Sequence, residues 1–281
     1  MLRLVGLRKT FGTVVAVDGL SLEIQRGEVF GLLGPNGAGK TTTISLAVGQ
    51  LRPDAGTVTL DGAGSPADPH VRRCIGVAPQ ALALYDELSG EENLRFFGRL
   101  YGLGGGTLRQ RVARLLDFVG LTERWRDRVA TYSGGMKRRL NLAVALVHEP
   151  ALILLDEPTA GVDPQSRNAI FEFVQTLKSE GRTVVYTTHY MEEAQRLCDR
   201  VAIMDHGRLL ALDTVAGLLR RTDRPPTVIL ERATGEERIE TADPKAELVR
   251  ALDQPDVLGV RVERPDLESV FLTLTGRRLR D

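Results

Sequence analysis

Residues 34–41 have the types and the spacing needed to bind the phosphates of a nucleotide. They follow the pattern G-x-x-x-x-G-K-[ST], in which glycines let the backbone turn tightly and aim successive N–H groups at phosphate oxygens. Lys40 supplies a positive charge for the β- and γ-phosphates, and the hydroxyl of Thr41 is placed to ligate Mg²⁺. The pattern predicts a bound nucleotide but does not say what its energy drives. The expected contacts are Gly34, Pro35, Asn36, Gly37, Ala38, Gly39, Lys40, Thr41 and Thr42.

Two adjacent carboxylates, Asp156 and Glu157, follow the apolar run of residues 152–155. Asp156 is expected to hold Mg²⁺ through water, and Glu157 to polarise the attacking water as a general base. A buried strand that ends in a solvated acidic turn is the alternative. The phosphate loop upstream favours the catalytic interpretation.

A third motif lies between these two, at residues 132–140. Ser133 can cap the helix that follows, and with the amides of Gly134 and Gly135 it forms a second anion site at a helix N-terminus. The simpler interpretation is an ordinary capped helix with glycines before it. That interpretation does not explain why the motif falls between the phosphate loop and the acidic strand.

Strands and helices alternate around these motifs, which indicates a parallel α/β core. Residues 1–25 carry short apolar alternations typical of an antiparallel β-layer. Residues from about 85 to 147 are mainly helical and begin with a capping box of Ser89 and Glu92. The core strands are expected at residues 29–33, 75–78, 152–156, 184–187 and 201–204.

A domain boundary is predicted near residues 218–226, a polar stretch that ends in two prolines. We expect a nucleotide-binding domain over residues 1–219 and a small α+β domain over residues 220–281. The small domain's strands are expected at residues 227–231, 237–241 and 257–262, and its helices at residues 244–252 and 266–274.

Composition indicates a cytosolic globular protein. The chain has 281 residues with 37 basic and 37 acidic side chains, so no global basic field attracts nucleic acid, and none is expected as a partner. No window approaches an uncharged apolar run of about 18 residues. Cys74 and Cys198 lack metal-ligand spacing and are expected to be reduced thiols.

The order of these motifs resembles that of the ATP-binding cassette (ABC) ATPase family over about residues 1–215. The resemblance implies a P-loop NTPase (RecA-like) core and hydrolysis of ATP with Mg²⁺. The matching positions are Phe11 (adenine-stacking aromatic), residues 34–41 (Walker A), Gln80 (Q-loop), residues 133–135 (signature), Asp156 and Glu157 (Walker B and catalytic glutamate), Asp163 (D-loop) and His189 (switch histidine).

The resemblance also implies roles and partners. Gln80 would contact Mg²⁺ or the attacking water, and His189 would hydrogen-bond the γ-phosphate. Two copies of the chain, or this chain and a homologue, would pair head to tail and hold each ATP between the Walker A loop of one and Ser133 and Gly135 of the other. A structural role for His189 and a core position for Phe11 are the alternatives.

Two departures from the family pattern stand out. Tyr132 replaces the usual leucine of the signature, and Met136-Lys137 follows its glycines; Gly161-Val162 precedes Asp163 in place of the common Ser-Ala-Leu. The run of residues 136–140 and the tail of residues 266–276 are similar to the daunorubicin-resistance-type branch of export ATPases. Apolar positions 267, 270, 271 and 274 of that tail also fit simple packing of one helix face.

The branch similarity favours the energising subunit of an exporter. A separate integral-membrane permease is then required, docked in a groove beside Gln80 that is lined by parts of residues 81–93. The chain would be cytoplasmic and peripheral on the inner face of the cell membrane. The alternatives are a soluble cassette in translation or DNA repair, and an importer ATPase.

Overall fold

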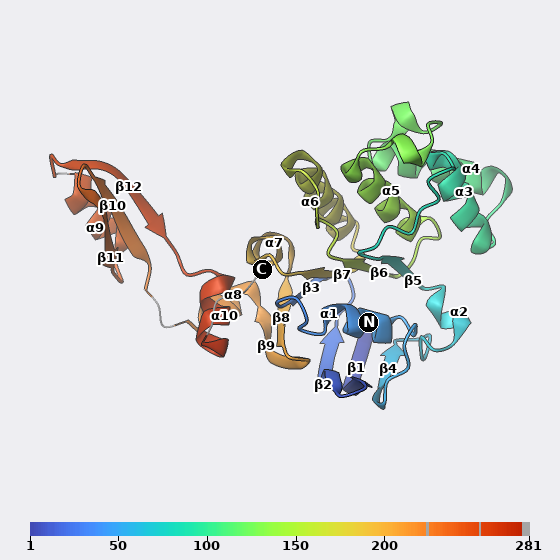
Figure 1. Cartoon of the computed structure of the whole chain (residues 1–281), viewed down its shortest axis with the longest axis horizontal. Coiled ribbons are helices and arrows are strands. Elements are labelled where there is room, and N and C mark those ends of the chain that lie inside the picture. Colours follow the sequence, from blue (N-terminus) through green and yellow to red (C-terminus); the bar gives the residue numbers. More distant parts are fainter. Residues whose placement is uncertain (223–224, 253, 277–281) are drawn as a thin grey trace. The chain divides into compact units, whose positions relative to one another are not determined.

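A computed structural model of the chain describes residues 1–222, 225–252 and 254–276. It divides into two compact units, Met1–Leu212 and the residues from Asp213 onward. Figure 1 shows the elements of both units. None of the helices in the described ranges combines the length and the apolar character that crossing a bilayer needs.

A six-stranded sheet forms the centre of the first unit, in the order β5-β6-β7-β3-β8-β9. The pairs among β5, β6, β7, β3 and β8 are parallel, so these strands end along one edge. The parallel arrangement predicted from alternation is confirmed. The bounds are Ile75–Ala78 for β5, Leu152–Asp156 for β6, Thr183–Thr188 for β7, Val29–Leu33 for β3, Arg200–Asp205 for β8 and Arg208–Thr214 for β9.

Strand β9 was not predicted. It follows β8 after a turn of His206 and Gly207, whose φ angles of 47° and 75° are those that tight hairpins require. Histidine is an uncommon residue for the left-handed region, which explains why the turn is hard to see in the sequence.

The predicted antiparallel layer is a sheet of order β2-β1-β4, with β1 at Leu2–Phe11, β2 at Val14–Ile24 and β4 at Ala55–Leu60. Helix α1 (Lys40–Ala47) lies between this layer and the large sheet in Figure 1. Buried residues of both sheets and of α1, such as Leu4, Ile44 and Leu154, belong to one apolar core. The phosphate loop, which leads into α1, is thus fixed between two sheets.

The helical insertion lies on the opposite side of the large sheet (Figure 1). It contains α3 (Gly90–Leu100), α4 (Gly105–Phe118) and α5 (Gly134–Leu146), with 3₁₀ turns at Thr122–Arg124 and Val129–Thr131. The predicted capping box is present: Ser89 N donates to the Glu92 carboxylate at 2.8 Å and Glu92 N to Ser89 Oγ at 3.2 Å. The remaining helices of the unit are α2 (Pro69–Arg72), α6 (Pro164–Ser179) and α7 (Met191–Leu197).

The described residues of the second unit form an antiparallel sheet of order β11-β10-β12 and three helices. The unit begins seven residues before the predicted boundary, because α8 packs against α10 of this unit. In α10, Leu267, Val270 and Phe271 are buried and Leu274 is 41% exposed, so packing accounts for most of that apolar stripe. The bounds are Val215–Leu219 for α8, Thr227–Arg232 for β10, Gly235–Glu240 for β11, Pro244–Leu252 for α9, Val257–Glu263 for β12 and Leu267–Thr275 for α10.

Candidate functional site

The carboxylate of Glu157 lies where three predicted site residues converge. Its Oε1 is 3.2 Å from Lys40 Nζ and 3.3 Å from His189 Nδ1. Its Oε2 accepts a hydrogen bond of 3.2 Å from the side-chain amide of Gln80. These groups come from four separate segments at the carboxyl edge of the large sheet, which is where ligands bind in open α/β sheets.

Glu157 has a φ angle of +45°, which is uncommon for a residue with a side chain. Its N–H donates to Thr187 Oγ1 at 2.9 Å, and that hydroxyl donates to Asp156 Oδ1 at 2.6 Å. Thr187 therefore orients both carboxylate residues, although its role was not predicted. The available signal was a hydroxyl near the end of a fully buried strand, because such a group needs a buried partner.

The phosphate loop is tightly enclosed at its two ends. A Cβ atom on Gly34 would lie 2.3 Å from the Met204 carbonyl oxygen, and one on Gly39 would lie 2.3 Å from that of Ala16. Gly39 also has a φ angle of +98°. These positions require glycine for space, and Gly39 for conformation as well.

Lys40 is buried at the first residue of α1. Its ammonium group donates to the carbonyls of Gly34 at 2.8 Å and Pro35 at 3.1 Å, in addition to the Glu157 contact. Asn36, Gly37 and Thr41 are exposed beside it. The loop thus places a cation and the N-terminus of a helix at one exposed surface, an arrangement suited to phosphate.

The predicted second anion site has a different setting. Ser133 caps α5 by accepting from Met136 N at 3.2 Å, and both Ser133 and Gly134 are exposed. Gly135 is buried against α6, where a Cβ would lie 1.9 Å from Ser166 Oγ. Among the described residues, no hydrogen bond or ion pair joins residues 133–135 to residues 34–42 or to Glu157.

Asp163 lies next to this second site. Its carboxylate caps α6 by accepting from the N–H of Ser166 at 2.9 Å and from its hydroxyl at 2.7 Å, and these bonds lower the pKa of Asp163. The Cβ built on Gly135 would be 3.4 Å from the same carboxylate. The structure therefore groups Asp163 with the Ser133 loop and not with Glu157.

Phe11 ends β1 and is 48% exposed, with the ammonium group of Lys9 5.7 Å from its ring centroid. The neighbouring strand β2 carries Ala16, which contacts Gly39 of the phosphate loop. An exposed ring in this layer is available for stacking, and the predicted alternative of a core position does not hold.

The oxygen donors near the phosphate loop suit Mg²⁺. The hydroxyl of Thr41, the carboxylate of Asp156 and the amide oxygen of Gln80 are all hard ligands. In the part of the chain that the structure describes, no three His, Cys, Asp or Glu side chains gather as a metal cage. Such a site fits Mg²⁺, which usually retains waters and shares ligands with substrate phosphates.

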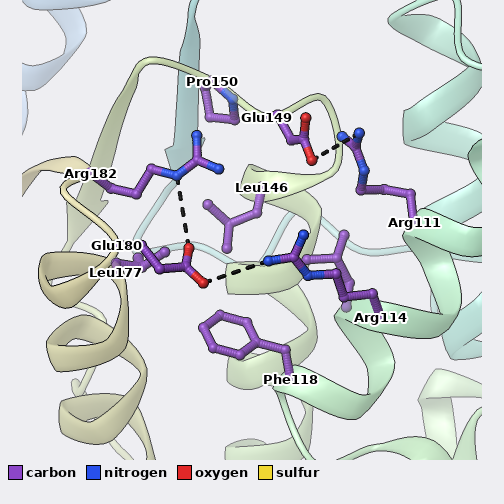
Figure 2. A pocket seen from close by; sticks show the side chains of 10 residues that line it. Arg111, Arg114, Phe118, Leu146, Glu149, Pro150, Leu177, Glu180 and Arg182 are labelled. Carbon is purple, nitrogen blue, oxygen red and sulfur yellow. Dashed lines mark ion pairs between the residues drawn. The ribbon is translucent and has the colours of Figure 1, made fainter.

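A separate hollow of about 50 Å³ lies among α4, the end of α5 and the end of α6 (Figure 2). Its rim carries paired charges: Arg111 is 2.9 Å from Glu149, and Arg114 is 3.5 Å from Glu180. Arg182 also faces Glu180, at 3.9 Å. Glu149 pairs with one arginine and Glu180 with two, so each of these charges has a partner within the chain, and this hollow is a junction between helices and not part of the site.

Residues 17–160 match the family model described as ABC transporter. The chain belongs to the ABC transporter family. The linearmycin resistance ATP-binding protein LnrL of Bacillus subtilis is 40% identical over the full length of both chains. The Nod factor export ATP-binding protein I of Cupriavidus metallidurans is 42% identical and covers 100% of this chain and 99% of its own.

Solved structures give the same result for the fold. The ATP-binding subunit of an ABC transporter has a TM-score of 0.71 and 32% identity over 79% of this chain and 92% of its own. A dimeric cassette in a post-hydrolysis state with bound ADP and Pi has a TM-score of 0.70 and 26% identity over 76% of this chain and 98% of its own. The chain is a P-loop ATPase cassette that binds and hydrolyses ATP.

Proposed function

We propose that this cassette energises an exporter: two cassettes pair around ATP, and the pairing drives a substrate through a separate membrane permease. The observation that carries the proposal is the separation of the two anion sites. One site surrounds Lys40 and Glu157. The other exposes Ser133, and among the described residues none of the phosphate loop bonds to it. The full-length similarity to a linearmycin resistance protein and to Nod factor export proteins supports the export direction.

In this proposal Glu157 is the general base. Its carboxylate is buried and is held by the side-chain amide of Gln80, while Thr187 fixes its main-chain N–H, so the carboxylate is positioned to accept a proton from the attacking water. His189, which lies 3.3 Å from the same carboxylate, would hydrogen-bond the γ-phosphate. Bound Mg²⁺, held by Thr41, Asp156 and Gln80, would neutralise charge on the phosphates.

Lys40 would have two positions. It contacts Glu157 at 3.2 Å, and a triphosphate in the loop offers it a more strongly charged partner. Movement of Lys40 to the β- and γ-phosphates would leave Oε1 of Glu157 free to accept a proton. The same residue would then bind ATP and release the base.

The shared ATP would complete the Ser133 site. Ser133 Oγ and the amides of Gly134 and Gly135 lie at the N-terminus of a 13-residue helix, which favours an anion. Phosphate of an ATP on the second cassette would supply it. Asp163, packed beside Gly135, would lie at the same contact between the two copies.

The permease would dock on an aromatic patch formed by Leu82, Tyr85 and Phe96. These side chains are 39%, 49% and 37% exposed. The rings of Tyr85 and Phe96 meet edge to face at 4.9 Å. Leu82 and Tyr85 of the patch follow Gln80 closely in the chain, so an apolar helix of the permease bound there can influence Gln80. The cassette would be peripheral to the membrane through this contact.

Co-purification with membranes tests the proposal. The tagged cassette, expressed with its permease and extracted in mild detergent, is expected to retain a protein with several membrane spans. A Tyr85→Ala, Phe96→Ala double variant should lose that protein, whereas Val249→Ala, an exposed apolar change on α9, should not. Recovery of ribosomes or DNA in place of a membrane protein would favour the translation or repair alternative, and inward transport by the recovered complex would favour the importer.

A further inference from the structure

Arg138 on α5 is a buried charge that the hydrolysis scheme above does not use. It is 7% exposed, and burial lowers the pKa of its guanidinium group. A buried arginine is costly unless its donors are bonded. Here the guanidinium donates to main-chain carbonyls of Gln80 at 2.8 Å, Pro79 at 3.4 Å and Ala160 at 3.2 Å.

These carbonyls belong to two segments that both reach Glu157. Gln80, whose main chain Arg138 holds, bonds Glu157 Oε2 with its side chain at 3.2 Å. Ala160 closes a turn on Glu157, because its N–H donates to the Glu157 carbonyl at 3.1 Å. Arg138 thus closes a ring of contacts in which Glu157 is held from both sides.

Neighbouring residues of α5 hold the same segment. Lys137 pairs with Asp86 at 2.8 Å. Asn141 donates to the Pro79 carbonyl at 3.2 Å and accepts from Ala83 N at 3.3 Å. One face of α5 therefore fixes the chain from Pro79 to Asp86, which leads into the aromatic patch.

We propose that Arg138 is a positioning residue, which ties the main chain of Gln80 and the Glu157–Ala160 turn to α5 and so holds the general base in place. The inference rests on the proposed role of Glu157. An arginine suits the task because its planar fork spreads its donors over separate nitrogens that reach carbonyl groups on two different segments, whereas the donors of lysine all lie on one nitrogen. Glutamine is too short to bridge both.

Arg139 provides a matched control on the same helix. Its guanidinium also donates to main-chain carbonyls, those of Val119 at 2.6 Å and Gly120 at 3.3 Å, but these lie at the end of α4. Arg138→Gln and Arg139→Gln remove the same charge from adjacent positions. Only the first change breaks the ring around Glu157.

The experiment measures affinity, turnover and amide exchange in Arg138→Gln, Arg138→Lys and Arg139→Gln. Arg138→Gln is expected to lower kcat roughly 10- to 100-fold while the Kd for a non-hydrolysable ATP analogue changes less than about 2-fold, because the phosphate loop is untouched. Hydrogen exchange should quicken together at residues 80–83 and 160–162. Arg139→Gln should change exchange near residues 119–121 and keep kcat.

Arg138→Lys keeps the charge, and its kcat and exchange rates should lie between those of wild type and Arg138→Gln. This variant keeps the test valid if Arg138→Gln folds poorly. Wild-type kcat and exchange in Arg138→Lys would show that the fork is not needed, and an equal loss of kcat in Arg138→Gln and Arg139→Gln would reduce Arg138 to a stabilising residue. Either result overturns the inference.

Failure of the proposed function is distinguishable from failure of this inference. Exchange at residues 80–83 and 160–162 is measured without hydrolysis, so it reports on Arg138 even where Glu157→Gln retains turnover. With Glu157 as the base, Arg138→Gln combined with Glu157→Gln should be no slower than Glu157→Gln alone, since residues that act as a unit are not additive. An inactive Glu157→Gln beside a fully active Arg138→Gln would refute the inference and leave the proposed function intact.

Discussion

The phosphate loop and the Ser133 loop are both helix N-termini preceded or followed by glycine, yet the chain builds them differently. The first is enclosed by backbone at Gly34 and Gly39, and Lys40 meets Glu157 inside it. The second presents Ser133 and Gly134 at the surface. The difference teaches that one site is organised to hold and cleave a phosphate, and the other to be brought to a phosphate by association.

Glu157→Gln tests the reactive side of this comparison and should have the largest effect. The amide keeps the shape and its contacts with Gln80 but cannot accept a proton, so turnover should fall about 10²- to 10⁴-fold with ATP still bound. Single-turnover and steady-state phosphate release give the measurement. Near-normal turnover would remove Glu157 as the general base.

Lys40→Ala tests the binding function of the same loop. It removes a charge-assisted contact with phosphate, worth about 1.5–3 kcal/mol, and should weaken ATP binding roughly 10- to 100-fold. Isothermal titration with an ATP analogue measures the affinity, and Lys245→Ala, which changes an exposed residue of α9, is the control. Unchanged affinity in Lys40→Ala would contradict the phosphate-loop assignment.

Substitutions at Gly134 and Gly135 distinguish a role in packing within the chain from a role in the pairing of two cassettes. Gly135→Ala meets Ser166 and should lower the free energy of unfolding by about 1–3 kcal/mol. Gly134→Ala has no atom within 4 Å of the new Cβ, so stability should be kept or rise by about 0.4–1 kcal/mol.

Turnover should nevertheless fall at least about 10-fold in Gly134→Ala, because the added methyl group lies where the second copy's phosphate must approach. Urea unfolding and phosphate release are the two readouts. Wild-type turnover in Gly134→Ala would show that this surface meets no nucleotide.

The smallest effect concerns His148, which follows the far end of α5. It stacks on Tyr101 at 3.6 Å, its Nε2 is 3.1 Å from the Ile75 carbonyl, and burial lowers its pKa to about 4. The unfolded chain binds this proton below about pH 6.5 and the folded chain does not, so stability is complete above that pH and falls as the pH drops towards 4.

His148→Phe keeps the stacking and removes the titration. The stability advantage of wild type over the variant should shrink by about 1 kcal/mol between pH 7.5 and pH 5.0, after allowance for solvent around the half-buried ring. Urea unfolding at the two pH values measures it. An advantage that does not change with pH would show that the pKa of His148 is not lowered in the folded chain.

Local patterns predicted the fold well because each depends on residues close in the chain. The strand before the phosphate loop, the cap at Ser133 and the box at Ser89 are of this kind. The family resemblance then supplied Gln80 and His189, which the structure brings to Glu157. Their chemical roles stay predictions.

Contacts between distant segments could not be predicted in this way. Thr187 orients Asp156, which lies on a neighbouring strand, and Arg138 reaches Ala160 on another loop. The inclusion of α8 in the second unit has the same origin, since α8 packs against α10. Each case depends on which elements pack against each other, and the periodicity of apolar residues along the chain does not predict that.

Sedimentation of Glu157→Gln tests the central claim, that one ATP is shared between the Lys40 loop of one cassette and the Ser133 loop of another. We predict a monomer without nucleotide and a dimer with ATP and Mg²⁺, and no ATP-dependent dimer when Gly134→Ala is added although ATP still binds. A monomer that persists at saturating ATP in Glu157→Gln, or a dimer indifferent to the change at Gly134, would contradict the shared site.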